Sequence, residues 1–325
     1  MATANEAVNQ QNIAIRIGKY LWKSYSLILI LILIFIIAGI MEPRFIAVSN
    51  QLIIFRHAAI IGMMALGMTF VVIAGGIDLS AGHAAAAAGT VLILLQGNEN
   101  IPIFVAILAC FAVAMTIGLV NGLIITKFKL PAFIVTLAIG LIVRSIALNA
   151  AGGVSITGRR IPEFTNIGNG TWVGPIPNAL LIWVVSAIIL GCVLAYTKFG
   201  SYVYAAGGNE TASRYSGIPV DRIRIICYVI TGFCVGMSAL LNFSRMAAIS
   251  AATASQLYEF DAITAVVVGG TTLAGGRGKI MGSFFGMIAV SVVSNLTIMF
   301  GISPYLTGLI KGAIILVAIL LQRRD

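Results

Sequence analysis

The sequence predicts an all-α protein that crosses a membrane several times, and three observations lead to that fold class. Hydrophobic residues make up 60% of the 325 residues and charged residues only 9%, whereas about 25% of a soluble domain is charged. The apolar residues form runs long enough to cross a bilayer, and most basic residues lie in the short segments between them. Glycine is abundant, with 35 residues, and small residues let helices approach closely in lipid. We therefore expect one membrane domain.

About ten transmembrane helices are predicted, some of them interrupted. The first is uncharged for 18 residues and lacks a small-residue cleavage site, so we expect a retained span and not a signal peptide. Glycines interrupt the second, third and eighth spans. The transmembrane domain then covers residues 24–321, between terminal segments 1–23 and 322–325. The ten spans are residues 24–41, 52–74, 81–97, 102–126, 131–150, 178–197, 223–243, 261–274, 280–300 and 304–321.

The charges in the loops predict the orientation. With the N-terminus in the cytoplasm, thirteen of the 20 lysines and arginines fall on the cytoplasmic side of the ten spans. Because cytoplasmic loops of membrane proteins are enriched in these residues, both termini are expected in the cytoplasm. This topology also explains the net charge of +10, so nucleic acid is not an expected partner.

The cytoplasmic loop of residues 197–224 is the longest polar segment between two strongly apolar ones. Gly207 and Gly208 are expected to break the backbone there, and Asn209 to cap a short helix that follows. Glu210 lies in the first turn of that helix, where the helix dipole favours an acid. A helix of about two turns is marginal alone in water. We therefore expect it to dock on a partner; the alternative is an ordered loop that only covers its own surface.

The longest loop on the opposite face covers residues 151–178. Its glycines and prolines argue against a long helix. Arg159, Arg160 and Glu163 in this loop are candidates to contact a partner on that face. The alternative is a solvated loop with ordinary charges.

Two stretches resemble one another, VVIAGGIDLSAG at residues 71–82 and VVVGGTTLAGG at residues 266–276. Each places a glycine pair where an apolar span turns, and the second pair is Gly269-Gly270. Broken backbone at membrane depth is tolerated only where protein or a water-filled cavity covers it. Transporters often build binding sites from such interrupted helices. The two stretches are therefore candidates for a central pathway.

A few polar residues fall inside or beside the apolar spans. Asp78 is the one carboxylate expected near membrane depth, which makes it a functional candidate; capping the third span is its alternative role. Arg144 and Lys311 could line a cavity, pair with a carbonyl or extend to the surface. Four asparagines could join neighbouring helices or face a polar solute. They are Asn121, Asn149, Asn242 and Asn295.

Several other chemistries lack a pattern in this sequence. His57 and His83 lie on different spans, so no metal site is expected. A phosphate-binding loop, G-x-x-x-x-G-K-[ST], would need Gly at the position of Leu273 and Ser or Thr at that of Ile280. Any ATP is therefore used by a separate subunit, and no cofactor is expected on this chain. Nor do the residues suggest the nucleophile and base of an enzyme.

Four motifs together resemble the permease subunits of bacterial ATP-binding-cassette importers for monosaccharides, of the ribose, xylose and arabinose type. The likeness covers about residues 45–311 and is strongest to ribose permeases. The motifs are GMTFVVIAGGIDLSAG (67–82), NGLIITKFKLPAFIVTLA (121–138), FGSYVYAAGGNETASRYSGIPVDRIRI (199–225) and YEFDAITAVVVGGTTLAGGRGKIMGS (258–283).

This resemblance implies a multi-pass protein of the bacterial cytoplasmic membrane that moves a ribose-like sugar by alternating access. An ion-coupled secondary transporter of a small polar solute is the alternative. The implied partners are a cassette ATPase, an extracytoplasmic sugar-binding protein, a second permease copy and the bilayer. The implied residues are Asn209, Glu210, Arg214 and Gly217 for coupling to the ATPase, Asp78, Asn121, Gly269, Gly270 and Asn295 for the pathway, and Arg159, Arg160, Glu163 and Glu259 for docking of the binding protein.

Overall fold

The structure is a computed structural model that describes residues 31–254 and 257–303, together with seven residues near the C-terminus. These seven are Leu306, Gly308, Leu309, Lys311, Gly312, Ala313 and Leu316. The predicted terminal segments 1–23 and 322–325 lie outside the described residues, as do parts of the first and last predicted spans. The chain divides into two compact units, Met1–Ala47 and Val48–Asp325.

The described part of the first unit is a short apolar helix, Leu31–Met41, followed by the 3-10 helix η1 (Pro43–Ile46). Glu42 caps η1 by accepting a hydrogen bond from the Arg44 backbone N–H at 3.2 Å. The rings of Phe35 and Phe45 meet edge to face, with centroids 5.4 Å apart. These contacts hold the two pieces of the unit together.

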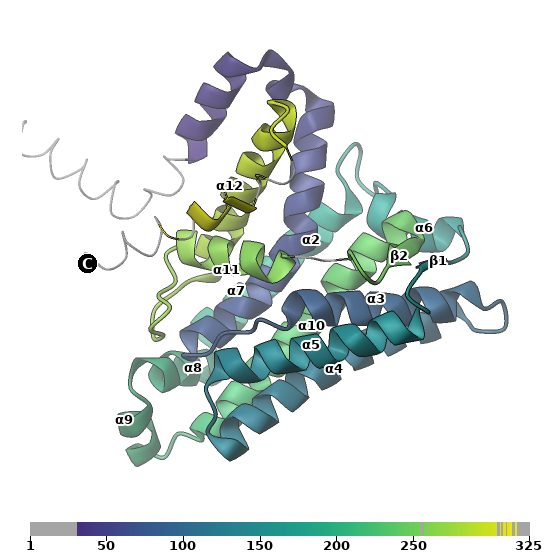
Figure 1. Ribbon diagram of the computed structural model, residues 1–325. Helices are drawn as coiled ribbons and strands as arrows, with labels where there is room; N and C mark the ends of the chain where they lie inside the picture. Colours follow the sequence, from purple (N-terminus) through teal and green to yellow (C-terminus); the bar gives the residue numbers. More distant parts are fainter. Residues whose placement is uncertain are drawn as a thin grey trace, which may run out of the picture. The chain divides into compact units, whose positions relative to one another are not determined.

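The second unit is a bundle of helices (Figure 1), and six of them are long and apolar enough to cross a membrane. Each of the six matches a predicted span to within a few residues. This confirms the prediction of a helical protein that crosses the membrane several times. The count of six refers only to the described residues. The helices are α2 (Val48–Ile73), α4 (Ile103–Phe128), α5 (Ala132–Ala150), α7 (Asn178–Tyr196), α10 (Val220–Met246) and α12 (Ile280–Met299).

Shorter helices complete the bundle. α3 (Ala81–Gly97) has the predicted bounds, whereas α11 (Tyr258–Val268) ends several residues before the predicted end at 274. Thr271 to Lys279 form an irregular loop between α11 and α12. At 11 residues α11 would be about 16 Å long, which is half the thickness of a bilayer core.

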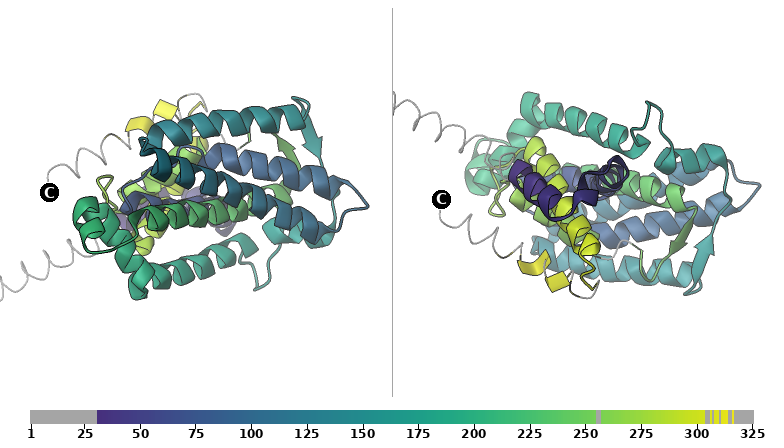
Figure 2. Two further views of the ribbon diagram at one scale, coloured as in Figure 1. Left: turned by 90° about the horizontal axis from the view of Figure 1, so that it is seen from below. Right: turned by 90° about the horizontal axis from the view of Figure 1, so that it is seen from above.

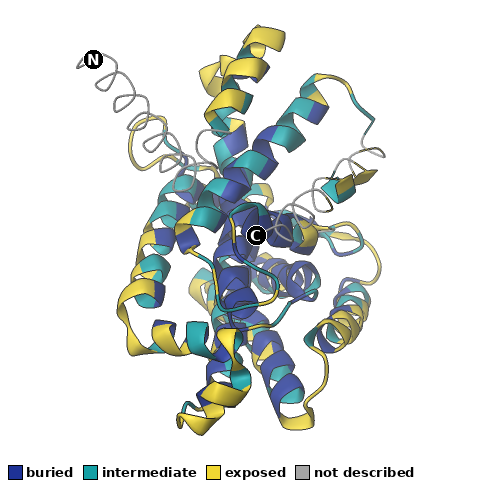
Figure 3. Cartoon of the chain, turned by 90° about the vertical axis from the view of Figure 1, so that its left-hand side faces the viewer, coloured by how far each residue is buried: buried dark blue, intermediate teal, exposed yellow. Residues whose placement is uncertain are grey.

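The burial pattern separates interior helices from peripheral ones. In its most apolar stretch α2 is 89% buried, whereas α4, α5 and α7 are only 22–28% buried. A helix that is apolar all round and buried belongs in the middle of a bundle, and α2 packs against α7, α10, α11 and α12. Figure 3 shows the buried residues gathered inside the bundle and the exposed ones along its rim. The exposed apolar faces of α4, α5 and α7 are thus suited to contact lipid.

Glycine permits the close packing of α10 on α4. A side chain at Gly232 in α10 would lie 2.6 Å from the Ala114 carbonyl oxygen in α4, and one at Gly118 would collide with the Tyr228 carbonyl. The helices therefore touch backbone to backbone, as small residues allow in membrane bundles.

The short helices and strands outside the bundle lie at two opposite ends of this unit (Figures 1 and 2). One end carries α8 (Lys198–Gly208) and α9 (Glu210–Tyr215). The other carries α6 (Pro162–Asn169) and a small antiparallel sheet of β1 (Ser155–Thr157) and β2 (Ala248–Ser250), in which Ile156 pairs with Ile249. The described part of the chain is therefore helical apart from loops and two three-residue strands.

Candidate functional site

The six-residue helix α9 lies at the end of the bundle that is predicted from the loop charges to be cytoplasmic. Asn209 caps it, as predicted: its side-chain Oδ1 accepts a hydrogen bond from the Ala212 N–H at 2.9 Å. Gly217, with φ +78°, ends the turn that follows. Only Ser213 of α9 is buried, and Tyr215 is 90% exposed. The helix therefore presents most of its surface to the outside of the chain.

The prediction that Gly207 and Gly208 break the backbone was wrong. Both residues are helical and form the last turn of α8, and the chain turns only at Asn209. Glycine is needed at 207 for another reason, because a side chain there would collide with the Ile73 carbonyl at the end of α2. Sequence reasoning missed α8, which begins with Thr197 accepting a hydrogen bond from the Gly200 N–H at 3.2 Å.

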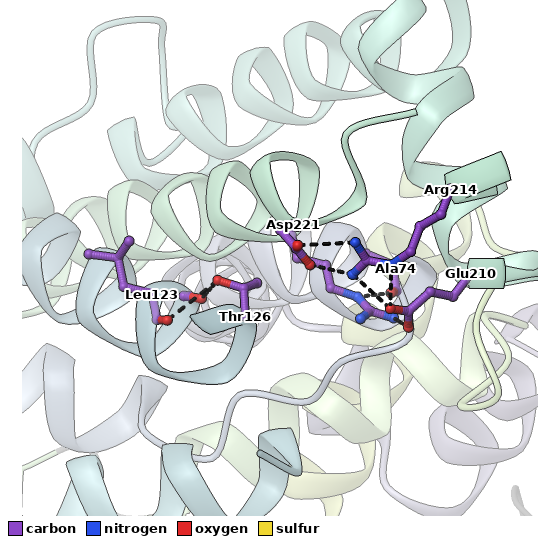
Figure 4. Close-up of polar contacts among 8 residues, drawn as sticks. Ala74, Leu123, Thr126, Glu210, Arg214 and Asp221 are labelled. Atoms are coloured by element: carbon purple, nitrogen blue, oxygen red, sulfur yellow. Dashed lines mark hydrogen bonds and ion pairs between the residues drawn. The ribbon is translucent and has the colours of Figure 1, made fainter. Parts of the chain in front are cut away.

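An ion-pair network holds α9 against the bundle (Figure 4). Arg214 lies between two acids, 2.9 Å from Glu210 and 2.5 Å from Asp221 at the start of α10. The second oxygen of Glu210 lies 2.7 Å from Arg224, which also donates a hydrogen bond to the Ala74 carbonyl at 3.3 Å. The network therefore links α9 through α10 to the chain that follows α2.

The network shifts the protonation of its members. Partial burial would raise the pKa of Glu210, but hydrogen bonds from Arg214 and Arg224 outweigh it and hold the pKa below its ordinary value of 4.5. Hydrogen bonds to Asp221 and Glu210 raise the pKa of Arg214 above its ordinary range. Both groups are therefore charged at neutral pH, and the pairs are intact.

A second set of contacts joins three segments at the end of α2. The Ile73 carbonyl accepts a hydrogen bond from the Gly276 N–H at 2.8 Å, in the loop between α11 and α12. Tyr204 in α8 donates its hydroxyl to the Gly278 carbonyl of the same loop at 2.8 Å. With Gly207 packed over Ile73, the end of α2, the helix α8 and the α11–α12 loop form one junction.

Asp78 lies in the break between α2 and α3 and is only 3% exposed. Its Oδ1 accepts hydrogen bonds from the Ser80 N–H at 2.9 Å and the Ser80 hydroxyl at 2.6 Å. The amide of Asn121 in α4 donates to that hydroxyl at 2.8 Å. Tyr228 in α10 donates to the Ile77 carbonyl at 3.0 Å. The carboxylate thus orders the turn into α3, and the structure brings Asp78 and Asn121 together through Ser80.

A cavity of about 190 Å³ lies beside this break and the ion-pair network. Its walls come from α2, α4, α5, α10 and the chain between α2 and α3. Arg224 and Tyr228 supply its polar side chains. Within the described residues, no group of three or more histidines, cysteines or acids is placed to hold a metal ion.

The other predicted pathway residues lie elsewhere. Asn295 in α12 and Asn50 in α2 exchange two side-chain hydrogen bonds, of 2.9 and 3.1 Å, which join those helices. Gly269 ends α11, where a side chain would collide with the backbone of Gly282 in α12, and Gly270 turns away with φ +85°. The contacts that these residues make are packing contacts between helices, and their role in the pathway stays a prediction.

The predicted docking residues divide into three kinds. Arg160 and Glu163 are exposed beside β1 and α6. Arg159 is bound to Gln96 at the end of α3, through its backbone N–H at 2.8 Å and its side-chain Nε at 2.8 Å. Glu259 is only 4% exposed in the first turn of α11, so burial removes it from any docking surface.

Comparison with known proteins gives the chain a family. A model described as "Branched-chain amino acid transport system / permease component" matches residues 50–319. The Haemophilus influenzae protein named Ribose import permease protein RbsC is 36% identical over 97% of this chain and 96% of its own length. The Bacillus subtilis protein of that name is 37% identical over 90% of this chain and 91% of its own. The Escherichia coli L-arabinose transport system permease protein AraH is 33% identical over 93% of this chain and 91% of its own length.

No solved structure matches the chain. The predicted likeness to permeases for ribose and arabinose is confirmed by these relatives. Together with the six apolar helices, they make the chain a multi-pass protein of the bacterial inner membrane and a transport subunit, not an enzyme. The chain belongs to the permease-component family of the branched-chain amino acid transport system.

Proposed function

We propose that this chain is the membrane-spanning subunit of an ATP-driven importer that carries a pentose such as ribose into a bacterium. Three similar proteins, each matched over at least 90% of this chain, are named as import or transport permeases for ribose or arabinose. Nucleotide binding belongs to a separate ATPase subunit, and this chain binds no cofactor. The relatives' names favour this function over an ion-coupled transporter.

The observation that carries the proposal is the position of α9. It is a short exposed helix at the end of the bundle, and its charged side chains are used to fasten it to α10 and to the end of α2. Because α9 is fastened in this way, a partner that displaces α9 also displaces α10 and the end of α2. Asn209, Glu210, Arg214 and Gly217 form and hold the helix, while Tyr215 presents its ring to the ATPase.

The contacts supply a route from α9 to the pathway. Arg224 ties Glu210 to Ala74, three residues before Ile77 and the turn at Asp78. The α8 junction reaches the α11–α12 loop through Gly276. Movement of α9 would thus act on both glycine-containing breaks together. We propose that these breaks alternate between outward- and inward-open arrangements during ATP turnover.

The remaining partners take the opposite end of the chain. The sugar-binding protein docks beside β1 and α6, on a surface that includes Arg160 and Glu163. A second permease copy completes the pathway, and all ten predicted spans cross the membrane with both termini in the cytoplasm. The end carrying α8 and α9 then faces the cytoplasm, in agreement with its basic residues.

The experiment that tests this function compares Tyr215→Ala with Tyr196→Ala in the assembled complex. Both residues are highly exposed, 90% for Tyr215 and 86% for Tyr196, but Tyr196 ends α7 and lies outside α9. We expect Tyr215→Ala to weaken ATPase co-purification and to lower ribose uptake by about tenfold, because exposed aromatic residues are frequent anchors at interfaces. Tyr196→Ala should behave as wild type. Equal recovery of the ATPase with both variants would remove α9 from the interface.

A further inference from the structure

Asp261 in the first turn of α11 and Lys311 in the last predicted span form an ion pair inside the bundle. Lys311 Nζ lies 2.7 Å from Asp261 Oδ2, and the two side chains are 21% and 2% exposed. In the sequence, Lys311 is the one charged residue between Lys279 and Arg323. Ionisable residues inside membrane spans are rare, usually pair with one another, and often mark functional sites. The pair is therefore a candidate for a role in transport.

The other end of α11 packs on α12 and leads into the junction described above. α11 and α12 lie side by side (Figure 1), and a side chain at Gly286 in α12 would collide with the Ala265 carbonyl in α11. In the loop that follows α11, the Gly276 N–H donates a hydrogen bond to the Ile73 carbonyl at the end of α2. α11 thus begins at the ion pair and ends beside the junction with α2 and α8.

The contacts at the two ends of α11 differ in kind. Packed helices can slide against each other by small amounts, and the contact between Gly286 and Ala265 involves backbone and no interlocking side chains. An ion pair instead joins one atom to another, and opposite charges attract strongly where little water screens them. The first turn of α11 is therefore held to the last predicted span more firmly than its other end is held to α12.

Stability alone does not explain a charged pair at this place. The cost of burying two charges can exceed their mutual attraction, and apolar side chains of similar volume often hold a fold equally well. The helix dipole favours an acid in the first turn, but it requires no lysine. Glu259 lies in the same turn at 4% exposure, and its Oε2 has no hydrogen-bond partner among the described residues. The lysine therefore pairs with Asp261 in particular.

We propose that the Asp261–Lys311 pair anchors α11 during transport. It keeps the first turn of α11 on the last span while movement of the junction turns the rest of the helix. Asp261 and Lys311 are then positioning residues that act through α11. Gly269 and Gly270 lie at the end of α11 that moves, so the anchor converts motion at α9 into a change at this break. This inference rests on the proposed import function and adds two residues to its mechanism.

The first test compares the double variant Asp261→Asn/Lys311→Met with Glu259→Gln in the full-length chain in nanodiscs. The double variant removes both charges and nearly preserves both shapes, so its thermal midpoint should stay close to that of the wild type. Amide hydrogen exchange of α11 should become about tenfold faster because the anchor is lost, whereas exchange of α12 should not change. Glu259→Gln is the matched control: it removes a buried charge from the same turn, leaves the ion pair intact and should exchange as the wild type does.

The second test uses the complex with the ATPase and the binding protein. The double variant should lower ribose uptake about tenfold and weaken the stimulation of ATP hydrolysis by the binding protein, because α11 no longer turns about a fixed point. Lys311→Arg keeps the positive charge next to Asp261 and should retain uptake and stimulation. A purely structural pair would instead change the thermal midpoint and leave the stimulation of the folded complex as it is.

Three results would overturn the inference: wild-type exchange of α11 in the double variant, a lower thermal midpoint with faster exchange in every helix, or a Lys311→Arg variant as defective as the double variant. The import function is tested separately by the wild-type complex. Wild-type ribose uptake by the double variant would leave the import function standing and remove the anchor. Faster exchange confined to α11, with no ATP-driven uptake by the wild-type complex, would leave the anchor standing and remove the import function.

Discussion

Arg159 and Arg160 show how neighbours in sequence differ in role. Arg159 is fixed to Gln96, whose amide also donates to the Arg159 carbonyl at 2.5 Å. Gln96 is fully buried at the end of α3. Arg160 projects from the same loop and is exposed. The pair of arginines therefore contains one structural residue and one residue free to contact a partner.

We predict that Gln96→Ala lowers the free energy of unfolding by about 1–3 kcal/mol, because it leaves the Arg159 N–H and carbonyl without their partner. Arg160→Ala should stay within about 0.5 kcal/mol of wild type, as exposed substitutions usually do. Denaturation of the purified chain in detergent measures both. Arg160→Glu should instead reduce stimulation of the ATPase by the binding protein. Unchanged stimulation would move the docking surface away from Arg160.

The pH dependence of the α9 network follows from Glu210. Its pKa is lower in the folded chain than the ordinary 4.5, so its ion pairs stabilise α9 above pH 4.5 and that contribution is lost as the pH falls through the lowered value. Hydrogen exchange of the α9 amides should therefore be slower in the wild type than in Glu210→Gln at neutral pH. The difference should vanish in strong acid. A difference that persists there would assign it to packing and not to charge.

At the scale of the elements, the junction of α8, α2 and the α11–α12 loop depends on one glycine. Gly207 and Gly208 are adjacent and both helical, yet only Gly207 faces the Ile73 carbonyl. The nearest atom to a side chain at Gly208 would be the Gly276 Cα at 3.9 Å, an ordinary contact. The two positions are therefore matched in sequence and conformation and differ in packing.

We predict that Gly207→Ala displaces α8, lowers the unfolding free energy by about 1–3 kcal/mol and reduces ribose uptake, because the new methyl group overpacks a backbone contact. Gly208→Ala should be neutral or stabilise by up to about 1 kcal/mol, since alanine favours a helix more than glycine. Thermal unfolding and uptake of the two variants provide the comparison. If both variants behave alike, the junction does not transmit motion through this contact.

For the whole molecule, the arrangement of the spans determines which surface meets which partner. The elements at one end of the second unit are α8 and α9, and those at the other end are β1, β2 and α6. Importer function requires these ends to face opposite sides of the membrane. The loop charges predict that the α9 end faces the cytoplasm.

This topology predicts the outcome of cysteine labelling. In a Cys192→Ala background, which removes the one exposed native cysteine among the described residues, Arg160→Cys should react with an impermeant maleimide in intact cells. Ser216→Cys, beside α9, should react only after the inner membrane is opened. Both positions are exposed, so accessibility reports the side of the membrane. Reaction of Ser216→Cys in intact cells would invert the proposed orientation.

The sequence by itself determined the class of the protein and the position of its main helices. Six predicted spans agree with the structure because long apolar runs have only one stable form in lipid, a helix that satisfies its own backbone hydrogen bonds. The helix cap at Asn209 could also be predicted from the sequence, because a capping side chain bonds to a backbone N–H only a few residues further on. Such features depend on local sequence.

Only the tertiary structure decided what the individual polar residues do. Glu259 and Glu163 are the same residue type, yet one is buried beside Asp261 and the other is exposed. The roles of Arg224 and Gly207 depend on Ala74 and Ile73, more than 130 positions away in the chain. Contacts of this kind are created by helix packing, and no spacing within a single segment encodes them. The fold class therefore follows from local hydrophobicity, whereas the ion-pair network around α9 and the junction at the end of α2 arise from long-range packing.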